Sequence, residues 1–303
     1  MPYTYRHTSL WYGMTVRSYA KINLGLRLLR KRPDGFHDLE TTFHRIELFD
    51  EIDFRRSRGT LTLTTDRGDL PIDSSNLCMR AAELMQSRAR AGAGVAMTLR
   101  KGIPVGAGLG GGSSDAATVL MVLRDLWSVP LRDEELTEMA LSLGSDVPYF
   151  LHSGSAVATG RGERLEPIAL VLPYWIVIVV PWLSVSTAWA YQNVRLQSRT
   201  PGSSLKAVLT NPSPDEKRLF AQLTNDFEPL VLEAHPAIRE VKQHLLKLGA
   251  RFALMSGSGS AVFALFADEQ MARQAVGTFT TDRYTVSLTK PGFMPPVPHI
   301  VRN

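Results

Sequence analysis

A run of glycines followed by two serines is the feature of this 303-residue sequence with the clearest chemical meaning. Five glycines and two serines lie between Pro104 and Asp115, directly before an apolar stretch. Because glycine has no Cβ and adopts positive φ easily, several backbone N–H groups of such a loop can converge on one anion. A helix that follows the loop adds the positive end of its dipole. The sequence therefore predicts a phosphate-binding loop before a helix at 116–127.

The alternative interpretation of this segment is a flexible linker. A linker explains neither the apolar helix that follows nor the proline that precedes the glycines, so we favour the phosphate-binding loop. The two serines are available to cap the helix. The residues that we expect to bind phosphate are Pro104, Val105, Gly106, Ala107, Gly108, Leu109, Gly110, Gly111, Gly112, Ser113 and Ser114.

Three well-known phosphate loops do not fit this spacing. The Walker pattern ends in Gly-Lys-Ser/Thr, and no Gly-Lys pair occurs in the chain. A dinucleotide fold needs an acidic residue about 20 positions further on at the end of a strand. The candidate here, Asp125, falls inside the expected helix. The protein-kinase pattern also fails, since H-R-D and D-F-G are both absent.

A lysine and an asparagine mark the first expected strand, Thr15 to Arg30. Alternation along a strand puts Lys21, Asn23 and Gly25 on one face and apolar residues on the other. A polar pair on an otherwise apolar strand suggests a site. The alternative is an exposed edge strand, where lysine prevents aggregation.

An aspartate and two ring side chains are further candidates. Asp146 follows Gly144 and precedes Pro148, so it can cap a helix, and an ionised carboxylate beside a lysine can accept a proton. Phe36 and His37 follow a turn, and they suit a nucleobase by stacking and by hydrogen bonding at the base edge. A phenylalanine that merely packs on the sheet is the alternative.

A second glycine-rich segment, 256–260, lies between two expected strands. It is either a tight hairpin turn or a lid that closes the site, and the residues alone do not choose between the two.

Composition restricts the possible partners. Lys and Arg exceed Asp and Glu by 34 − 29 = 5, and the isoelectric point is near 9.4. This excess suits a polyanionic ligand but is too small to require nucleic acid.

The single cysteine, Cys78, excludes an internal disulfide and fits a reducing cytoplasm; we expect it to be buried in a helix. The apolar stretch 168–183 is short for a membrane span and contains prolines, so we expect a buried strand and no membrane partner.

Periodicity predicts an α+β chain of two domains, residues 14–168 and 169–303. Residues 1–13 are a misassigned start or an unstructured lead, and 197–215 is expected to be a surface loop. The expected strands are 15–30, 39–54, 95–100, a return strand at 155–162, 175–180, 252–255 and 261–266. The expected helices are 76–90, 116–127, 133–143, 236–248 and 269–278, with a helical region opening at 225.

Three motifs occur in the order found in one enzyme superfamily. Residues 20–26, 104–117 and 255–261 resemble the three motifs of the GHMP small-molecule kinases, and the resemblance extends over about residues 16–266. It implies an ATP-dependent kinase with a ribosomal-protein-S5-domain-2-like N-terminal domain and a ferredoxin-like C-terminal domain. The triple glycine, the turn at 34–37 and the segment 143–148 are similar to those of the branch that phosphorylates a cytidine-diphosphate-linked polyol.

The resemblance also implies roles. Asp146 would be the general base and Lys21 would orient it and stabilise charge on the transferred phosphoryl group, while Asn23 and His37 would contact the acceptor. Mg²⁺ would accompany ATP, with Ser113 or Ser114 facing it. The alternatives are a GHMP kinase for homoserine or a mevalonate derivative, and a catalytically silent ligand sensor. No feature of the sequence predicts an oligomeric state.

Overall fold

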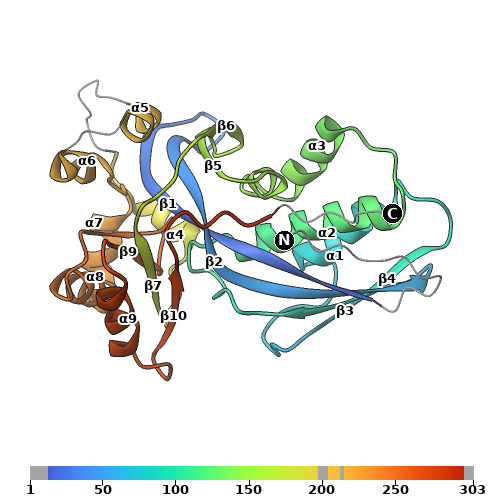
Figure 1. Ribbon diagram of the computed structural model, residues 1–303. Coiled ribbons are helices and arrows are strands. Elements are labelled where there is room, and N and C mark those ends of the chain that lie inside the picture. The colour runs from blue at the N-terminus through green and yellow to red at the C-terminus, as the bar shows by residue number, and fades with distance from the viewer. Residues whose placement is uncertain (1–12, 197–203, 212–214, 297–303) are drawn as a thin grey trace.

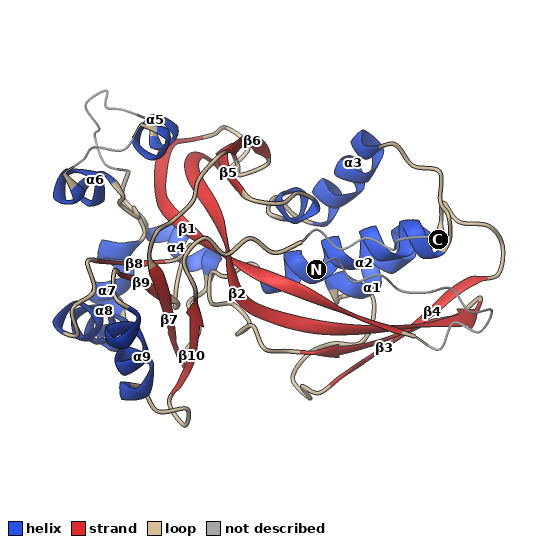
Figure 2. Ribbon diagram, viewed as in Figure 1, coloured by secondary structure: helices blue, strands red, loops and turns tan. Residues whose placement is uncertain are grey.

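Two β-sheets, each covered by helices, make up the computed structural model of the chain (Figures 1 and 2). The structure describes residues 13–196, 204–211 and 215–296, so most of the N-terminal segment 1–13 lies outside the described residues. Within the described part of the chain, no helix is long and apolar enough to cross a membrane.

The first sheet is organised around one long strand, β2. Strand β1 pairs antiparallel along one edge of β2, while β4 and β5 share the other edge. The strands of this sheet are β1 (Met14–Lys31), β2 (His37–Arg58), β3 (Leu61–Thr65), β4 (Ala93–Arg100), β5 (Ser155–Gly160) and β6 (Arg164–Ile168).

Strand β3 is a difference from the sequence-based expectation. It pairs parallel with β4, with a helix between the two strands, so one βαβ crossover is present that the sequence did not predict. The segment was missed because it is only five residues long and has a single buried side chain, Leu63. The edge strand β6 was also missed.

The first sheet and its helices form what we call the first unit, and the second sheet and its helices form the second unit. The helices of the first unit pack on one face of its sheet (Figure 1). They are α1 (Leu77–Gln86), α2 (Gly111–Leu126), α3 (Asp133–Leu143) and the 3₁₀-helix η1 (Val147–Leu151). Asn76 caps α1 through its side chain, and Cys78 is buried in that helix as expected. Helix α2 begins at Gly111, five residues earlier than predicted. The two serines therefore lie inside its first turn, and the prediction that they cap it was wrong.

The second sheet is antiparallel with the order β10-β7-β9-β8, the ferredoxin-like arrangement that was expected. Helices α8 and α9 cover one of its faces. The elements of this unit are β7 (Trp175–Pro181), α4 (Thr187–Asn193), α5 (Leu205–Thr210), α6 (Glu216–Gln222), α7 (Glu228–Ala234), α8 (Pro236–Lys247), β8 (Phe252–Met255), β9 (Val262–Phe266), α9 (Glu269–Thr278) and β10 (Tyr284–Thr289).

The prediction of a surface loop at 197–215 was wrong for residues 204–211, which the structure describes. Residues 204–211 include α5, whose Leu205 is fully buried against the β1 strand near Gly25. Residues 197–203 and 212–214 lie outside the described residues. The short helices α4 to α6 were not predicted, because six or seven residues carry too little periodicity to distinguish them from loops.

The two units share their cores. Leu26, Leu28 and Leu39 from the far end of the β1–β2 hairpin are buried with side chains of the second sheet. Near the other terminus, Phe293 packs against Tyr19, with ring centroids 5.5 Å apart. The predicted division between residues 168 and 169 falls between β6 and β7, where the chain passes from one sheet to the other.

Candidate active site

The glycine loop joins β4 to α2 and follows a left-handed path at alternate residues. Gly106, Gly108 and Gly110 have φ angles of 68°, 78° and 71°. The loop is fixed on both sides by backbone hydrogen bonds: Lys21 of β1 donates to the carbonyl of Leu109, and Ala261 donates to that of Ala107. A rigid loop with positive φ at every second residue presents the N–H groups that an anion needs.

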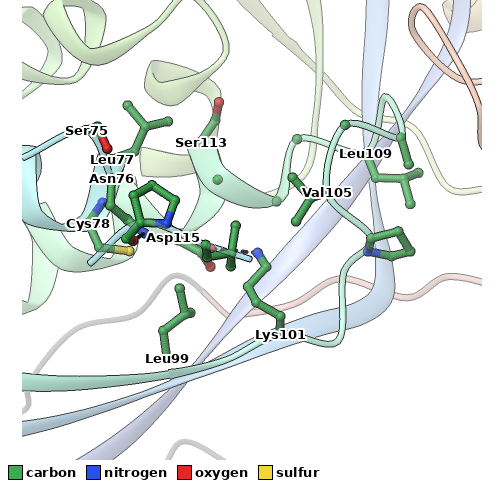
Figure 3. A pocket seen from close by; sticks show the side chains of 18 of the residues that line it. Ser75, Asn76, Leu77, Cys78, Leu99, Lys101, Val105, Leu109, Ser113 and Asp115 are labelled. Atoms are coloured by element: carbon green, nitrogen blue, oxygen red, sulfur yellow. Dashed lines mark hydrogen bonds and ion pairs between the residues drawn. The ribbon is translucent and has the colours of Figure 1, made fainter. Parts of the chain in front are cut away.

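A cavity of about 420 Å³ lies on one side of this loop (Figure 3). Its walls are the glycine loop, the start of α2 and a set of mainly apolar side chains, whose members include Leu70, Pro71, Leu77, Leu99 and Val105. A cavity of this size with apolar walls suits a small organic ligand such as a nucleoside. The glycine loop lies where the phosphates of a nucleotide would be, if its nucleoside occupied the cavity.

A buried ion cluster supports the base of the cavity. Lys101 forms ion pairs with Asp50 and Asp115, and all three side chains are buried. Asp50 also accepts hydrogen bonds from the backbone N–H groups of Gly102 and Ile103, at 2.8 Å each. Burial, together with the charge of Asp115, raises the pKa of Asp50 to about 7. The cluster fixes the chain immediately before the glycine loop. The sequence analysis missed it because its members are far apart along the chain.

Lys21 and Asp146 meet on the other side of the loop. The Nζ of Lys21 lies 3.5 Å from Oδ2 of Asp146 and donates to the carbonyl of Gly108 at 3.1 Å. Lys21 is 4% exposed, so it is not the exposed lysine of an aggregation-resistant edge, whereas the Asp146 side chain is 35% exposed and can reach a ligand. Burial lowers the pKa of Lys21, and the charge of Asp146 opposes this effect.

Asn23 lies beside Lys21 and is hydrogen-bonded through both its amide oxygen and its amide nitrogen. Its Oδ1 accepts from Lys21 at 2.6 Å, and its Nδ2 donates to Thr41 at 2.8 Å. The side chain is buried. In this arrangement Asn23 orients Lys21, so the predicted contact with an acceptor stays a prediction.

The two serines of the loop differ in their surroundings. Ser114 is buried, where its hydroxyl donates to the carbonyl of Tyr19 and accepts from Ser18. Ser113 lines the cavity in the first turn of α2. Of the two, only Ser113 lines the cavity, and the predicted contact of a serine with Mg²⁺ stays a prediction.

The predicted base-binding residues lie beside Tyr191 and Arg161. His37 is buried and its ring packs on Tyr191 of α4, with centroids 5.3 Å apart. Burial raises the pKa of Tyr191 to about 12, with a further contribution from the charge of Asp146. Phe36 is 53% exposed and lies under the guanidinium of Arg161, so it is not a core residue. The sequence analysis missed Tyr191 and Arg161, which have no local motif.

The second glycine-rich segment is both a hairpin turn and a contact of the site. It joins β8 to β9. Ser256 donates from its hydroxyl to the carbonyl of Gly108 at 3.0 Å and accepts from the backbone N–H of Asn23 at 3.2 Å. The second unit therefore closes over the glycine loop, and the two alternatives for this turn are compatible.

Comparisons with known proteins agree with this geometry. Residues 76–154 match the GHMP kinases N terminal domain, and residues 206–282 match the GHMP kinases C terminal family. A 4-diphosphocytidyl-2-C-methyl-D-erythritol kinase of Chlorobium phaeobacteroides is 46% identical over 282 residues, which cover 92% of this chain and 96% of that protein. The same kinase of Chlorobaculum tepidum is 42% identical over 92% of this chain and 98% of its own length.

The chain belongs to the 4-diphosphocytidyl-2-C-methyl-D-erythritol kinase family of the GHMP kinases.

Solved structures agree with the family assignment. A crystal structure of 4-(cytidine 5'-diphospho)-2C-methyl-D-erythritol kinase has a TM-score of 0.78 and 34% identity, and the match covers 92% of this chain and all of that one. A homoserine kinase from Cytophaga hutchinsonii has a TM-score of 0.68 at 19% identity over 97% of each chain, a likeness of fold alone. The expected two-domain GHMP kinase fold is confirmed, and the chain is an ATP-dependent small-molecule kinase.

Proposed function

We propose that this kinase transfers the γ-phosphoryl group of ATP to the 2-hydroxyl of 4-diphosphocytidyl-2-C-methyl-D-erythritol, a step of the non-mevalonate isoprenoid pathway. The observation that carries the proposal is the position of a half-buried aspartate, Asp146, which is connected to the glycine loop and to the predicted base-binding residues. Asp146 pairs with Lys21, which bonds to the carbonyl of Gly108 in the glycine loop, and the charge of Asp146 also acts on Tyr191, whose ring packs on His37.

The donor occupies the cavity and the glycine loop. The apolar walls suit adenine, and the backbone N–H groups of the loop and of the first turn of α2 suit the phosphates. In this arrangement the γ-phosphoryl group extends toward Lys21, whose ammonium group stabilises the charge on the transferred group.

The acceptor hydroxyl reacts next to Asp146. The carboxylate accepts the hydroxyl proton as the oxygen forms its bond to the γ-phosphorus, and the bond between that phosphorus and the β,γ-bridging oxygen breaks to release ADP. The ion pair with Lys21 at 3.5 Å orients Asp146. His37 and Tyr191 bind the cytosine end of the acceptor, His37 through a base-edge hydrogen bond.

Mg²⁺ fits this site as a companion of ATP. Among the residues that the structure describes, no cluster of three His, Cys, Asp or Glu side chains could hold a metal by itself. This fits Mg²⁺, which binds largely through substrate phosphates and water. The Ser113 hydroxyl is the protein group available to it, and the ion would supply charge neutralisation at the phosphates.

The single, buried and unpaired Cys78 supports a cytoplasmic location for the enzyme.

A coupled assay for ADP release tests the proposal. With ATP and Mg²⁺, we expect turnover of 4-diphosphocytidyl-2-C-methyl-D-erythritol and none of homoserine or mevalonate. Equal turnover of either alternative would refute the assignment of the acceptor. ATP binding without turnover of any acceptor would support the catalytically silent sensor instead.

A further inference from the structure

Arg161 lies in the turn between β5 and β6, between the two ends of the proposed acceptor site. The residue before it, Gly160, pairs with Leu39 on the strand that begins at His37. The residue after it, Gly162, lies close to Asp146, the predicted general base. A Cβ placed on Gly162 would lie 3.7 Å from Oδ1 of Asp146. One turn therefore connects the base-binding end with the reacting end.

The guanidinium of Arg161 points to the base-binding end of this path. Its Cζ lies 4.8 Å from the centroid of the Phe36 ring. The side chain is half-buried, and it forms no ion pair with any residue that the structure describes. The nearby carboxylate of Asp34 is paired with Arg32 at 2.8 Å.

The other cations around this site are paired or buried, except Lys31, which lies opposite His37 on β1 and is exposed. Lys21 is buried and bound to Asn23 and Gly108 beside the predicted base. Arg32 also pairs with Asp38. Arg161 is thus a half-buried arginine that forms no ion pair among the described residues, although its charge helps to lower the pKa of Asp34. It lies next to an exposed aromatic ring.

An acceptor made of a cytidine, a diphosphate and a polyol places its negative charge between the base and the reacting hydroxyl. Arginine is suited to this group, because its planar guanidinium donates two parallel hydrogen bonds to phosphate oxygens. We propose that Arg161 binds the diphosphate of the acceptor and thereby sets the distance between the bound base and Asp146. This inference rests on the proposed function.

Calorimetry with two fragments of the acceptor tests the role of Arg161. CDP contains the base and the diphosphate, whereas cytidine contains the base alone. Both are titrated into wild type and Arg161→Met in the presence of a non-hydrolysable ATP analogue, which occupies the glycine loop. We expect Arg161→Met to weaken CDP binding about 10- to 150-fold, the range for a lost hydrogen bond to a charged group, and to leave cytidine binding unchanged.

Two further variants sharpen the result. Arg161→Lys keeps the charge but not the fork, so we expect a loss of CDP affinity between those of wild type and Arg161→Met. Arg164→Met removes an exposed arginine three residues away on β6 and should bind both ligands as wild type does.

Equal losses for CDP and cytidine in Arg161→Met would overturn the inference, since the arginine would then act by holding Phe36. An unchanged affinity for CDP would overturn it too. If wild type binds neither CDP nor cytidine, the proposed acceptor is wrong and the inference falls with it.

Discussion

Gly108 of the glycine loop and Ser256 of the β8–β9 turn are in direct backbone contact. A Cβ placed on Gly108 would lie 2.2 Å from the carbonyl oxygen of Ser256, and the hydroxyl of Ser256 donates to the carbonyl of Gly108 at 3.0 Å. The two residues are 148 positions apart, and the strands that precede them, β4 and β8, belong to different sheets. Position 108 therefore requires glycine for two reasons: its φ angle is positive, and there is no room for a Cβ atom. The same contact connects the glycine loop to the second sheet and its helices.

Gly108→Ala should therefore destabilise the protein more than Gly106→Ala. Both glycines have positive φ, but a Cβ on Gly106 has no neighbour within 4 Å. We expect about 1–2 kcal/mol for the left-handed strain in either variant. Gly108→Ala should cost a further ~1–3 kcal/mol for the displaced backbone. Urea unfolding without nucleotide measures the difference, and equal losses would show that the two units can separate at this point.

Asp146→Asn should fold normally and bind ATP but lose most of its turnover. An amide cannot accept the hydroxyl proton, and the loss of a general base typically lowers kcat by about 10²- to 10⁴-fold. Steady-state kinetics and ATP calorimetry measure the two effects. The control, Asp282→Asn, changes an exposed carboxylate in the turn before β10 and should be neutral. A near-normal kcat in Asp146→Asn would remove this residue from the mechanism.

Ser113→Ala and Ser114→Ala should separate a metal contact from a structural one. Ser113 lines the cavity, so its removal should raise the Mg²⁺ concentration needed for half-maximal activity. Ser114 is buried against Tyr19 and Ser18, and its removal should instead lower the free energy of unfolding by about 1 kcal/mol. Magnesium titrations and urea unfolding of both variants check this. A raised Mg²⁺ requirement in Ser114→Ala alone would reverse the assignment.

The sequence was most informative where residues adjacent in the chain do the chemistry. The glycine loop and the helix at 133–143 were predicted because periodicity and glycine spacing are local signals. The boundary of α2 was wrong because the first turn consists of glycines and serines, which favour caps and turns in general. Here the fold overrides that preference, since the hydroxyl of Ser114 bonds to Tyr19 instead of capping the helix.

The rest of the site depends on contacts between distant segments. Tyr191 meets His37 only because the far end of the β1–β2 hairpin packs into the second unit. Lys101 meets Asp50 across the β2–β4 pair. No spacing in the sequence announces either pairing, because both arise from the register of strands and the packing of the two units.

Acid should destabilise the protein partly through His44. Its ring lies 2.7 Å from the hydroxyl of Ser155, and burial lowers its pKa to about 4 from an ordinary value of 6.5. Below pH 6.5 the unfolded chain binds a proton that the folded chain does not, so the stability due to neutral His44 is complete above pH 6.5 and is lost as pH falls toward 4. The loss amounts to about 3 kcal/mol.

His44→Gln removes this titration, so the difference between its unfolding free energies at pH 7 and pH 4.5 should be smaller than in wild type. Urea unfolding at both pH values measures it. His152→Gln, at an exposed position, serves as the control and should keep the wild-type difference. If His44→Gln also keeps it, other groups carry the acid sensitivity.

His37→Ala addresses the acceptor. Burial, followed by the charge of Lys31, lowers the pKa of His37, so its neutral imidazole offers one donor and one acceptor to a base edge at neutral pH. A buried hydrogen-bond partner is worth about 1–3 kcal/mol, so the KM for the cytidylyl acceptor should rise roughly 5- to 150-fold. The KM for ATP should barely change, because the cavity beside the glycine loop does not include this residue. Initial-rate kinetics with each substrate varied in turn measure both constants, with His152→Ala as the control. An unaltered acceptor KM, or comparable turnover of the polyol phosphate that lacks the cytidylyl group, would refute base recognition by His37 and reopen the choice among GHMP acceptors.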